Sequence, residues 1–238
     1  MKCWLLVMMG LPLLAAAEEG WDGSFEVRGV STSGNSRMDR WQGALSLQDR
    51  FGANLLELDA SSLFERSAAA GEARHLTRQV QEVSLEYARF HEDWPGWYAF
   101  LQPRWRYVGP AAEHLAFMAL GLGWFSEPAE DEQGSWRMES GVGYRRHHLA
   151  GQEPQVSGMA LVSIEAEQAV SSALTFSGRF RGERGAHDYL LSLQLRLKHR
   201  LNDRLSFSLG WDGRRSGPVA EAMRHTDTAT LLGAEYAF

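Results

Sequence analysis

The chain has 238 residues, with 24 Lys and Arg against 30 Asp and Glu, and a formal net charge of −6. This acidic, well-mixed charge argues against a nucleic-acid partner. The single cysteine, Cys3, excludes an internal disulfide framework and a cysteine-based zinc site.

The first residues, MKCWLLVMMGLPLLAAAEEG, have the three parts of a secretory signal peptide. Lys2 gives the positive start, Cys3 to Leu14 form the apolar run, and Ala15 to Ala17 offer a cleavage site. The alternative is an uncleaved membrane anchor, but a spanning helix needs roughly 20 apolar residues and this run is shorter. We therefore predict a signal peptide over residues 1–17 and one exported domain over 18–238. No later stretch is apolar enough for a spanning helix.

Apolar and polar residues alternate with a period of two through the exported domain, which predicts strands with one dry and one wet face. The clearest run is YLLSLQLRLKHRL, followed by the turn dipeptide Asn202-Asp203 and a second alternating run, RLSFSLGW. The same pattern predicts twelve strands: 23–31, 38–50, 54–64, 77–90, 96–107, 114–125, 135–147, 158–168, 173–181, 187–201, 204–212 and 226–238. The strands at 114–125 and 158–168 are less regular, because both of their faces carry apolar residues.

The connections favour a membrane barrel over a soluble one. Several turns after even-numbered strands are short (FGA, AVSSA, ND), whereas residues 65–76, 150–157 and 213–227 form long polar loops after odd-numbered strands. The turns TSGNS and SEPAEDEQGS depart from this rule. A soluble β-sandwich or lipocalin-like barrel is the alternative, but strands of this length better suit a tilted crossing of about 9–11 residues plus rims. Pro103 removes a ladder donor, so it weakens the fifth strand or marks a bulge.

The chain ends in LLGAEYAF, where Leu232, Ala234, Tyr236 and Phe238 share one face. In a closed antiparallel transmembrane β-barrel of about twelve strands, this last strand pairs with SFEVRGV and leaves no open edge. Tyr236 and Phe238 then belong to an aromatic girdle at the membrane interface, together with Trp94, Trp97, Trp124 and Trp136. A terminal Phe also resembles the signal that outer-membrane barrels present to their assembly machinery.

The stretch GSFEVRGVSTSGNSRMDRWQGALSL resembles one family in particular. These are the small Gram-negative outer-membrane barrels classed as domain of unknown function 481, or YdiY-like proteins, described as salt- or acid-induced. The segments PRWRYVG and ESGVGYRR are also similar. The resemblance implies fold and outer-membrane location, and no catalytic residues, because the family has no established activity.

If the apolar faces meet lipid, charged side chains of both signs line the lumen and should pair across strands. The residues predicted there are Glu26, Arg28, Glu57, Asp59, Glu82, Glu86, Arg104, Arg106, Arg137, Glu139, Glu165, Glu167, Arg179, Arg181, Arg196, Lys198, Arg204 and Glu235. Either they form a packed electrostatic plug, or they leave a watery path for small solutes. A twelve-stranded barrel lies between small filled barrels and open porins, so its size admits both.

An enzyme acting on phospholipid or lipopolysaccharide is the alternative function. Residues two apart share one face of a strand, and none of the eight histidines has a Ser at that spacing. A cross-strand Ser–His pair stays open. The pair His147-His148 points to opposite faces and makes a poor chelate, so we predict no metal and no cofactor.

We therefore expect a monomeric Gram-negative outer-membrane barrel, with no catalytic site, that contacts membrane lipid, lipopolysaccharide and the barrel-assembly machinery. Its expected role is a structural or stress-related one in the envelope, and slow diffusion of small solutes through the barrel is the transport role that we consider.

Overall fold

The computed structural model describes residues 21–32, 36–69, 75–109, 113–126, 134–186, 188–217 and 226–238. The predicted signal peptide, residues 1–17, and the Ser-Gly-Asn turn at 33–35 lie outside the described residues. Among the described residues, no helix is long and apolar enough to cross a membrane.

The described residues form twelve strands, one for each predicted strand. They are β1 Asp22–Thr32, β2 Ser36–Phe51, β3 Asn54–Ala69, β4 His75–Phe90, β5 Trp97–Gly109, β6 Glu113–Ser126, β7 Gly134–His148, β8 Gln155–Ala169, β9 Leu174–Gly185, β10 Tyr189–Arg200, β11 Leu205–Gly217 and β12 Thr226–Ala237.

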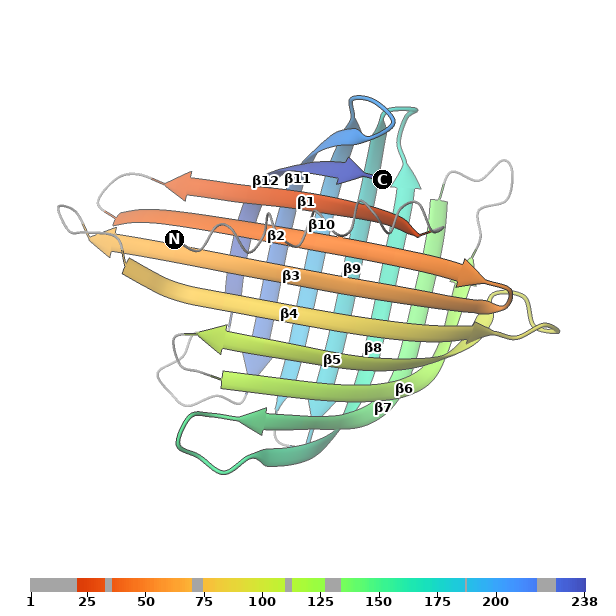
Figure 1. Ribbon diagram of the computed structural model, residues 1–238, viewed down its shortest axis with the longest axis horizontal. Coiled ribbons are helices and arrows are strands. Elements are labelled where there is room, and N and C mark those ends of the chain that lie inside the picture. Colours follow the sequence, from red (N-terminus) through yellow and green to blue (C-terminus); the bar gives the residue numbers. More distant parts are fainter. Residues whose placement is uncertain are drawn as a thin grey trace.

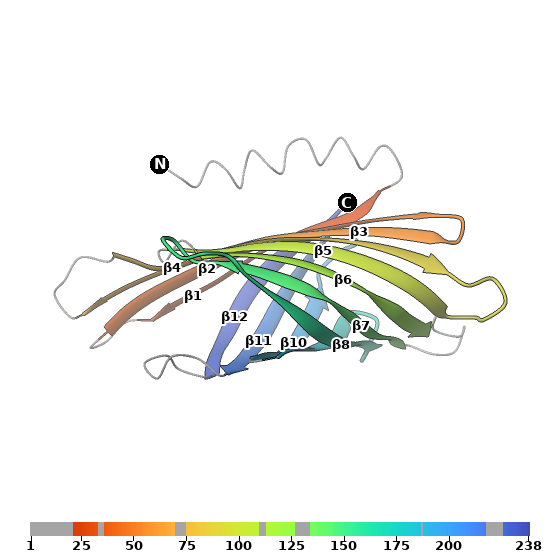
Figure 2. The ribbon, with the colours of Figure 1, turned by 90° about the horizontal axis from the view of Figure 1, so that it is seen from below.

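The strands form a closed antiparallel barrel in which each pairs with its sequence neighbours and β12 pairs with β1. This confirms the predicted fold class. Phe238 and Gly23 complete the closure by exchanging backbone N–H···O bonds of 3.0 and 2.9 Å. The strands are strongly inclined, so β1–β7 cross in front of β8–β12 at a large angle (Figure 1), and the view from below shows a broad, flattened wall (Figure 2).

Several strands are longer than the alternation predicted. β3 continues to Ala69 and β11 to Gly217, so part of the predicted polar loops 65–76 and 213–227 is strand, and β9 continues to Gly185, past its predicted end at residue 181. Backbone pairing therefore persists where the apolar pattern stops, because water as well as lipid tolerates a paired ladder.

We call the end with residues 52–53, 91–96, 170–173 and 201–204 the turn rim, and the opposite end, with 149–154, the loop rim.

Pro103 neither ends β5 nor causes a bulge. The β4–β5 ladder lacks the pairs Leu85–Pro103 and Glu86–Gln102, then resumes in the same register at Tyr87–Leu101. On its other side Pro103 pairs with Met118 of β6. The lack of a backbone N–H at Pro103 thus removes only the neighbouring hydrogen bonds between β4 and β5 and does not change their register. The register shift in the described barrel lies elsewhere, between Glu65 and Arg66.

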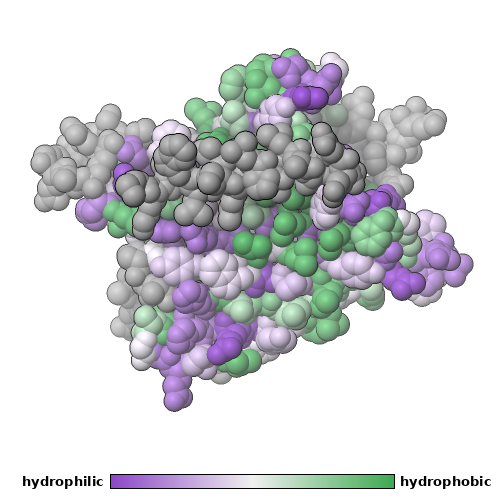
Figure 3. Space-filling model, in the orientation of Figure 1, coloured by the Kyte–Doolittle hydropathy of each residue, from purple (hydrophilic) through white to green (hydrophobic). Residues whose placement is uncertain are grey.

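The barrel is apolar outside and charged inside. Leu193 and Phe207 are 37% and 53% exposed on the outer face, whereas Glu26 and Arg28 are 4% and 5% exposed. Hydrophobic side chains are spread over the outer face between more hydrophilic ends (Figure 3). This arrangement is the reverse of a soluble globule and matches a barrel surrounded by lipid.

Glycines let β6 and β7 approach closely beside the ring of Phe100. A Cβ added at Gly143 would lie 2.1 Å from the carbonyl oxygen of Met118, and one at Gly121 would lie 2.1 Å from that of Ser140. Backbone atoms cannot move aside as a flexible side chain can. This part of the wall therefore requires glycine for packing.

Gly143→Val should destabilise the barrel by about 1–3 kcal/mol or more, because the new side chain overlaps backbone. Urea unfolding of the refolded protein in detergent measures the effect. Gly158→Ala is the matched control, because at Gly158 the nearest atom to an added Cβ is 4.0 Å away. Equal stability losses in the two variants would contradict this packing role.

Candidate functional site

The interior of the barrel holds a cavity of about 730 Å³ to which every strand contributes lining residues. It reaches from Ser24, Gln48 and Glu235 toward the turn rim to Arg40 and Arg78 toward the loop rim. As many cationic as anionic side chains line it. This charge-lined cavity is the candidate functional site.

The structure places the predicted lumen residues along this cavity: Glu26, Arg28, Glu57, Asp59, Glu82, Glu86, Arg104, Arg106, Arg137, Glu139, Glu165, Glu167, Arg179, Arg181, Arg196, Lys198 and Glu235. The assignment of Arg204 was wrong. It lies exposed in the turn before β11, where its guanidinium contacts the hydroxyl of Tyr236 at 3.3 Å. The side chain of Asn202 accepts hydrogen bonds from the backbone N–H groups of Arg204 and Leu205, so the turn takes up residues predicted as strand.

Arg137 of β7 is the centre of one side-chain network. Its guanidinium donates to Glu57 of β3 at 2.6 Å, to Glu139 at 2.9 Å and to Glu86 of β4. It also donates to the hydroxyl of Tyr98 at 2.8 Å, and that hydroxyl donates to Glu139 at 2.8 Å. Strands β4, β5 and β6 separate β3 from β7 in the wall, so Arg137 reaches across the lumen rather than along the wall.

The network continues from β4 to β9. Gln102 donates to Glu86 at 2.8 Å and accepts from Arg181 at 2.7 Å, and Arg181 donates to Glu183 at 2.8 Å. Arg104 of β5 pairs with the same carboxylate. Strands β6, β7 and β8 lie between β5 and β9 in the wall. These pairs therefore form a second connection across the lumen.

An apolar cluster packs on the inner face of β4, β5, β6 and β8. Tyr98, Phe100, Phe117, Met159 and Leu161 are each less than 9% exposed and pack together with other buried apolar residues. The guanidinium of Arg104 lies 4.0 Å from the ring centre of Phe117. The alternation did not reveal this cluster, although the apolar residues on both faces of β6 and β8 were its sequence signal.

A separate network joins β1, β10, β11 and β12. Glu26 binds Arg28 at 2.6 Å, accepts from Ser208 at 2.6 Å and lies 3.3 Å from Arg196. A Cβ at Gly233 would lie 2.7 Å from the Arg28 side chain, so glycine there makes room for this cation. Glu235 pairs with Lys198 at 3.2 Å. Charge inside the barrel is thus largely compensated by neighbouring side chains.

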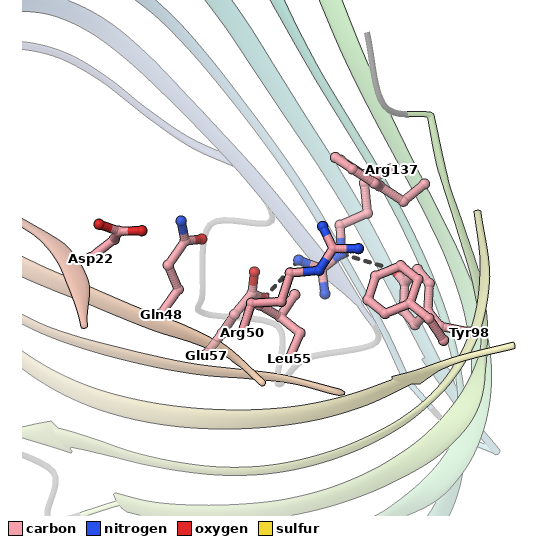
Figure 4. Close-up of a pocket in the computed structure, with 9 residues that line it drawn as sticks. Asp22, Gln48, Arg50, Leu55, Glu57, Tyr98 and Arg137 are labelled. Carbon is pink, nitrogen blue, oxygen red and sulfur yellow. Dashed lines mark hydrogen bonds and ion pairs between the residues drawn. The ribbon is translucent and has the colours of Figure 1, made fainter. Parts of the chain in front are cut away.

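A smaller cavity of about 290 Å³ adjoins the Arg137 network toward the turn rim. Figure 4 shows Glu57 and Arg50 on one side facing Arg137 and Tyr98 on the other, with Asp22 and Gln48 farther along the wall. Leu55, Phe90 and Phe125 give this cavity an apolar floor. The Glu57–Arg137 pair stands where the two cavities meet, because both residues line both of them.

The described residues hold little that suits catalysis. No group of three or more His, Cys, Asp or Glu in the described ranges could hold a metal ion. In the strand registers that the structure describes, one Ser stands opposite a His, namely Ser67 opposite His75, and no hydrogen bond joins them. His147 binds Glu113 at 2.9 Å. His187 and His225 lie outside the described residues.

The predicted aromatic girdle residues gather at the turn rim. Trp97 pairs with Trp124 across β5 and β6, and Trp136 follows on β7 opposite Ser126. Trp94 lies in the 91–96 turn, stacked on His91 with ring centres 4.7 Å apart. Tyr236 is 38% exposed on the outer face, and the ring of Phe238 covers Gly23, where an added Cβ would lie 2.8 Å from it.

Two solved structures share this fold at low sequence identity. The NanC porin has a TM-score of 0.56 and 11% identity, over 89% of this chain and 98% of the porin. The translocator domain of the autotransporter NalP from Neisseria meningitidis has a TM-score of 0.51 and 12% identity, over 96% of this chain and 94% of that domain. A comparison with curated protein sequences gave no match. At these identities the likeness establishes the fold alone.

The sequence comparison with protein families is more specific. The profile of the family described as "Protein of unknown function, DUF481" matches residues 26–238, which includes all strands from within β1 to the end of the chain. The resemblance inferred from the opening hairpin is thereby confirmed, and the chain belongs to the DUF481 family.

Proposed function

We propose that this protein is a narrow outer-membrane channel through which small hydrophilic solutes diffuse. The observation that supports it is the charge-lined cavity of about 730 Å³, to which residues near both rims contribute. The NanC structure, which has the same fold, is named as a porin. In this proposal the turn rim faces the periplasm and the loop rim faces outward, as in other barrels of this kind.

The connections across the lumen would set the size of the path. The Glu57–Arg137 pair joins β3 to β7 where the two cavities meet, and it is only partly buried, with side-chain exposures of 22% and 16%. An ion pair across the lumen holds both side chains in fixed positions, and these side chains narrow the route for a solute. Complete closure by such pairs would instead give the structural, plug-like role in the envelope.

Glu57→Ala should raise the single-channel conductance in planar bilayers, because it removes the β3 end of this connection. Glu86 and Glu139 still neutralise Arg137 in the variant, so no buried cation is left unpaired. Arg89→Ala is the control, because Arg89 pairs with Asn54 on the outer face and does not line the cavity. The control should conduct as the wild-type protein does.

The outcomes separate the channel from the plug. A wild-type barrel that never conducts at any salt concentration, with Glu57→Ala equally silent, would defeat the channel and leave the structural role. A conductance increase that Arg89→Ala reproduces would show that the effect does not arise in the lumen.

The C-terminal aromatic is proposed to direct assembly by the barrel-assembly machinery. Phe238→Ala should lower the amount of folded barrel in the outer membrane of expressing cells, measured by heat-modifiable migration in gels. Phe207→Ala is the matched control, because Phe207 is an outward aromatic, 53% exposed, on the adjacent strand. If Phe238→Ala also refolds poorly from urea into detergent, the defect is one of stability and the assembly role fails.

The described residues contain no hydrogen-bonded pair of a nucleophile and a base, so nothing in them supports an enzymatic role. Purified protein incubated with phospholipid and with lipopolysaccharide should therefore give no hydrolysis product by mass spectrometry. Ser67→Ala serves as the comparison, since Ser67 stands opposite His75. Turnover that Ser67→Ala abolishes would replace the channel proposal with an esterase.

A further inference from the structure

The outer surface of the barrel differs between its two rims. At the turn rim it is chiefly aromatic, with Trp97 and Trp136 47% and 48% exposed. The outward Asp, Arg and His side chains on the described strands there are Asp49, Arg89 and His199, and Arg204 of the 201–204 turn contacts the outward Tyr236. At the loop rim, Asp39 is the one acidic side chain that faces outward on the described strands, and Glu153 is exposed in the 149–154 turn. The outward basic side chains there are Arg66, His114, Arg146, His148, Arg184 and Arg215.

Two of these arginines flank a smooth part of the wall. Arg146 of β7 pairs in register with Val156 of β8, and Arg184 of β9 pairs with Ala160 of β8. Gly158 lies between these two β8 positions, and an added Cβ there would meet nothing closer than 4.0 Å. Small side chains on β8 thus separate two long cations, which leaves a shallow, accessible strip between them.

Neither guanidinium group has a protein partner among the residues that the structure describes. Arg146 and Arg184 are exposed, and neither forms a hydrogen bond or ion pair with any residue in the described parts of the chain. Their neighbours in sequence behave differently: Arg145 pairs with Asp188 and Glu183 with Arg104, both on the lumen side. These inward charges are thus paired within the barrel, whereas the two outward cations have no partner among the described residues.

An aromatic group borders the strip on β5 and β6. The rings of Tyr107 and His114 have centres 5.0 Å apart, and Trp105 lies 6.1 Å from His114. His114 in turn stands opposite His148 of β7. Figure 3 shows hydrophilic residues over the left-hand ends of β5–β7, which belong to the loop rim. Aromatic rings of this kind sit at the level of lipid headgroups, which places the two arginines at the same level.

A guanidinium on a lipid-facing wall is costly at the bilayer centre and nearly neutral at the interface. Its planar fork binds phosphate bidentately. Because neither Arg146 nor Arg184 has a partner among the described residues, the phosphate of a lipid headgroup is the partner that fits them best. In the asymmetric outer membrane, the phosphate-rich lipid is the one in the outward leaflet.

We propose that the outer wall of β7–β9 at the loop rim, between Arg146 and Arg184, binds the phosphate groups of lipopolysaccharide. The proposal rests on the outer-membrane location proposed above but is independent of conduction. The excess of cations at this rim matches an anionic headgroup, and the aromatic turn rim matches the less charged inner leaflet.

The test uses the full mature chain refolded in detergent and measures binding of diphosphoryl lipid A by native mass spectrometry and by microscale thermophoresis. Arg146→Gln/Arg184→Gln should weaken binding at least about tenfold, because each lost guanidinium removes a charge-assisted hydrogen-bonding group. Dephosphorylated lipid A should bind the wild-type protein as weakly as diphosphoryl lipid A binds the double variant. Heat-modifiable migration first establishes that each variant is folded.

Arg89→Gln is the matched control, because Arg89 is an outward arginine at the turn rim. Its affinity for diphosphoryl lipid A should equal that of the wild-type protein. Equal binding by the double variant, an equal loss in Arg89→Gln, or binding that ignores the phosphates would each overturn the proposal.

The same preparations separate this site from the channel. The double variant should keep the wild-type conductance, since neither residue lines the lumen cavity. A barrel that binds lipid A through Arg146 and Arg184 but never conducts would support the lipid site while defeating the channel. A barrel that conducts but shows no phosphate-dependent binding would do the reverse.

Discussion

Complete pairing of the backbone within the wall is the constraint on which the rest of the structure depends. Hydrocarbon offers no partner to a free N–H or C=O, so a sheet that crosses it must close on itself. Here closure extends to the last residue, Phe238, which bonds to Gly23. Once the wall is closed, every strand must turn alternate side chains to lipid and to the lumen, and the period of two in the sequence follows from that geometry.

The lumen then has to accommodate the polar half of each strand without leaving isolated charges. Mixed charge largely meets this requirement, because many cations find carboxylates on their own or on other strands, as Arg137 does with Glu57, Glu86 and Glu139. Side chains that meet across the interior also narrow it. The same pairs that make a charged interior tolerable would therefore determine what can pass, which links the packing of the barrel to its proposed transport role.

The sequence predicted well on which face of the barrel wall each side chain lies, but it predicted poorly which side chains meet across the lumen. Alternation alone predicted that Glu57 and Arg137 point inward, since orientation depends only on the position within a strand. It could not predict that they meet, because contact across the lumen depends on strand tilt and register around the whole barrel. The apolar cluster of Phe100, Phe117 and Leu161 was missed for a related reason. Apolar residues on both faces of β6 do not show which face is the inner one, and alternation gives no sign that part of the barrel interior is apolar. The polar strand extensions were missed because pairing outlasts the apolar signal.

The interruption at Pro103 has a consequence for how the wall and the lumen depend on each other. One of the two backbone pairs missing between β4 and β5 belongs to Glu86 and Gln102, and the side chains of these two residues are joined by a hydrogen bond of 2.8 Å. A side-chain hydrogen bond inside the lumen thus joins the two strands where their backbone hydrogen bonds are missing. Glu86 also binds Arg137. If the lumen carries solutes as proposed, a solute that competes for this carboxylate would weaken the contact between β4 and β5, so that filling the lumen would also change the stability of the wall.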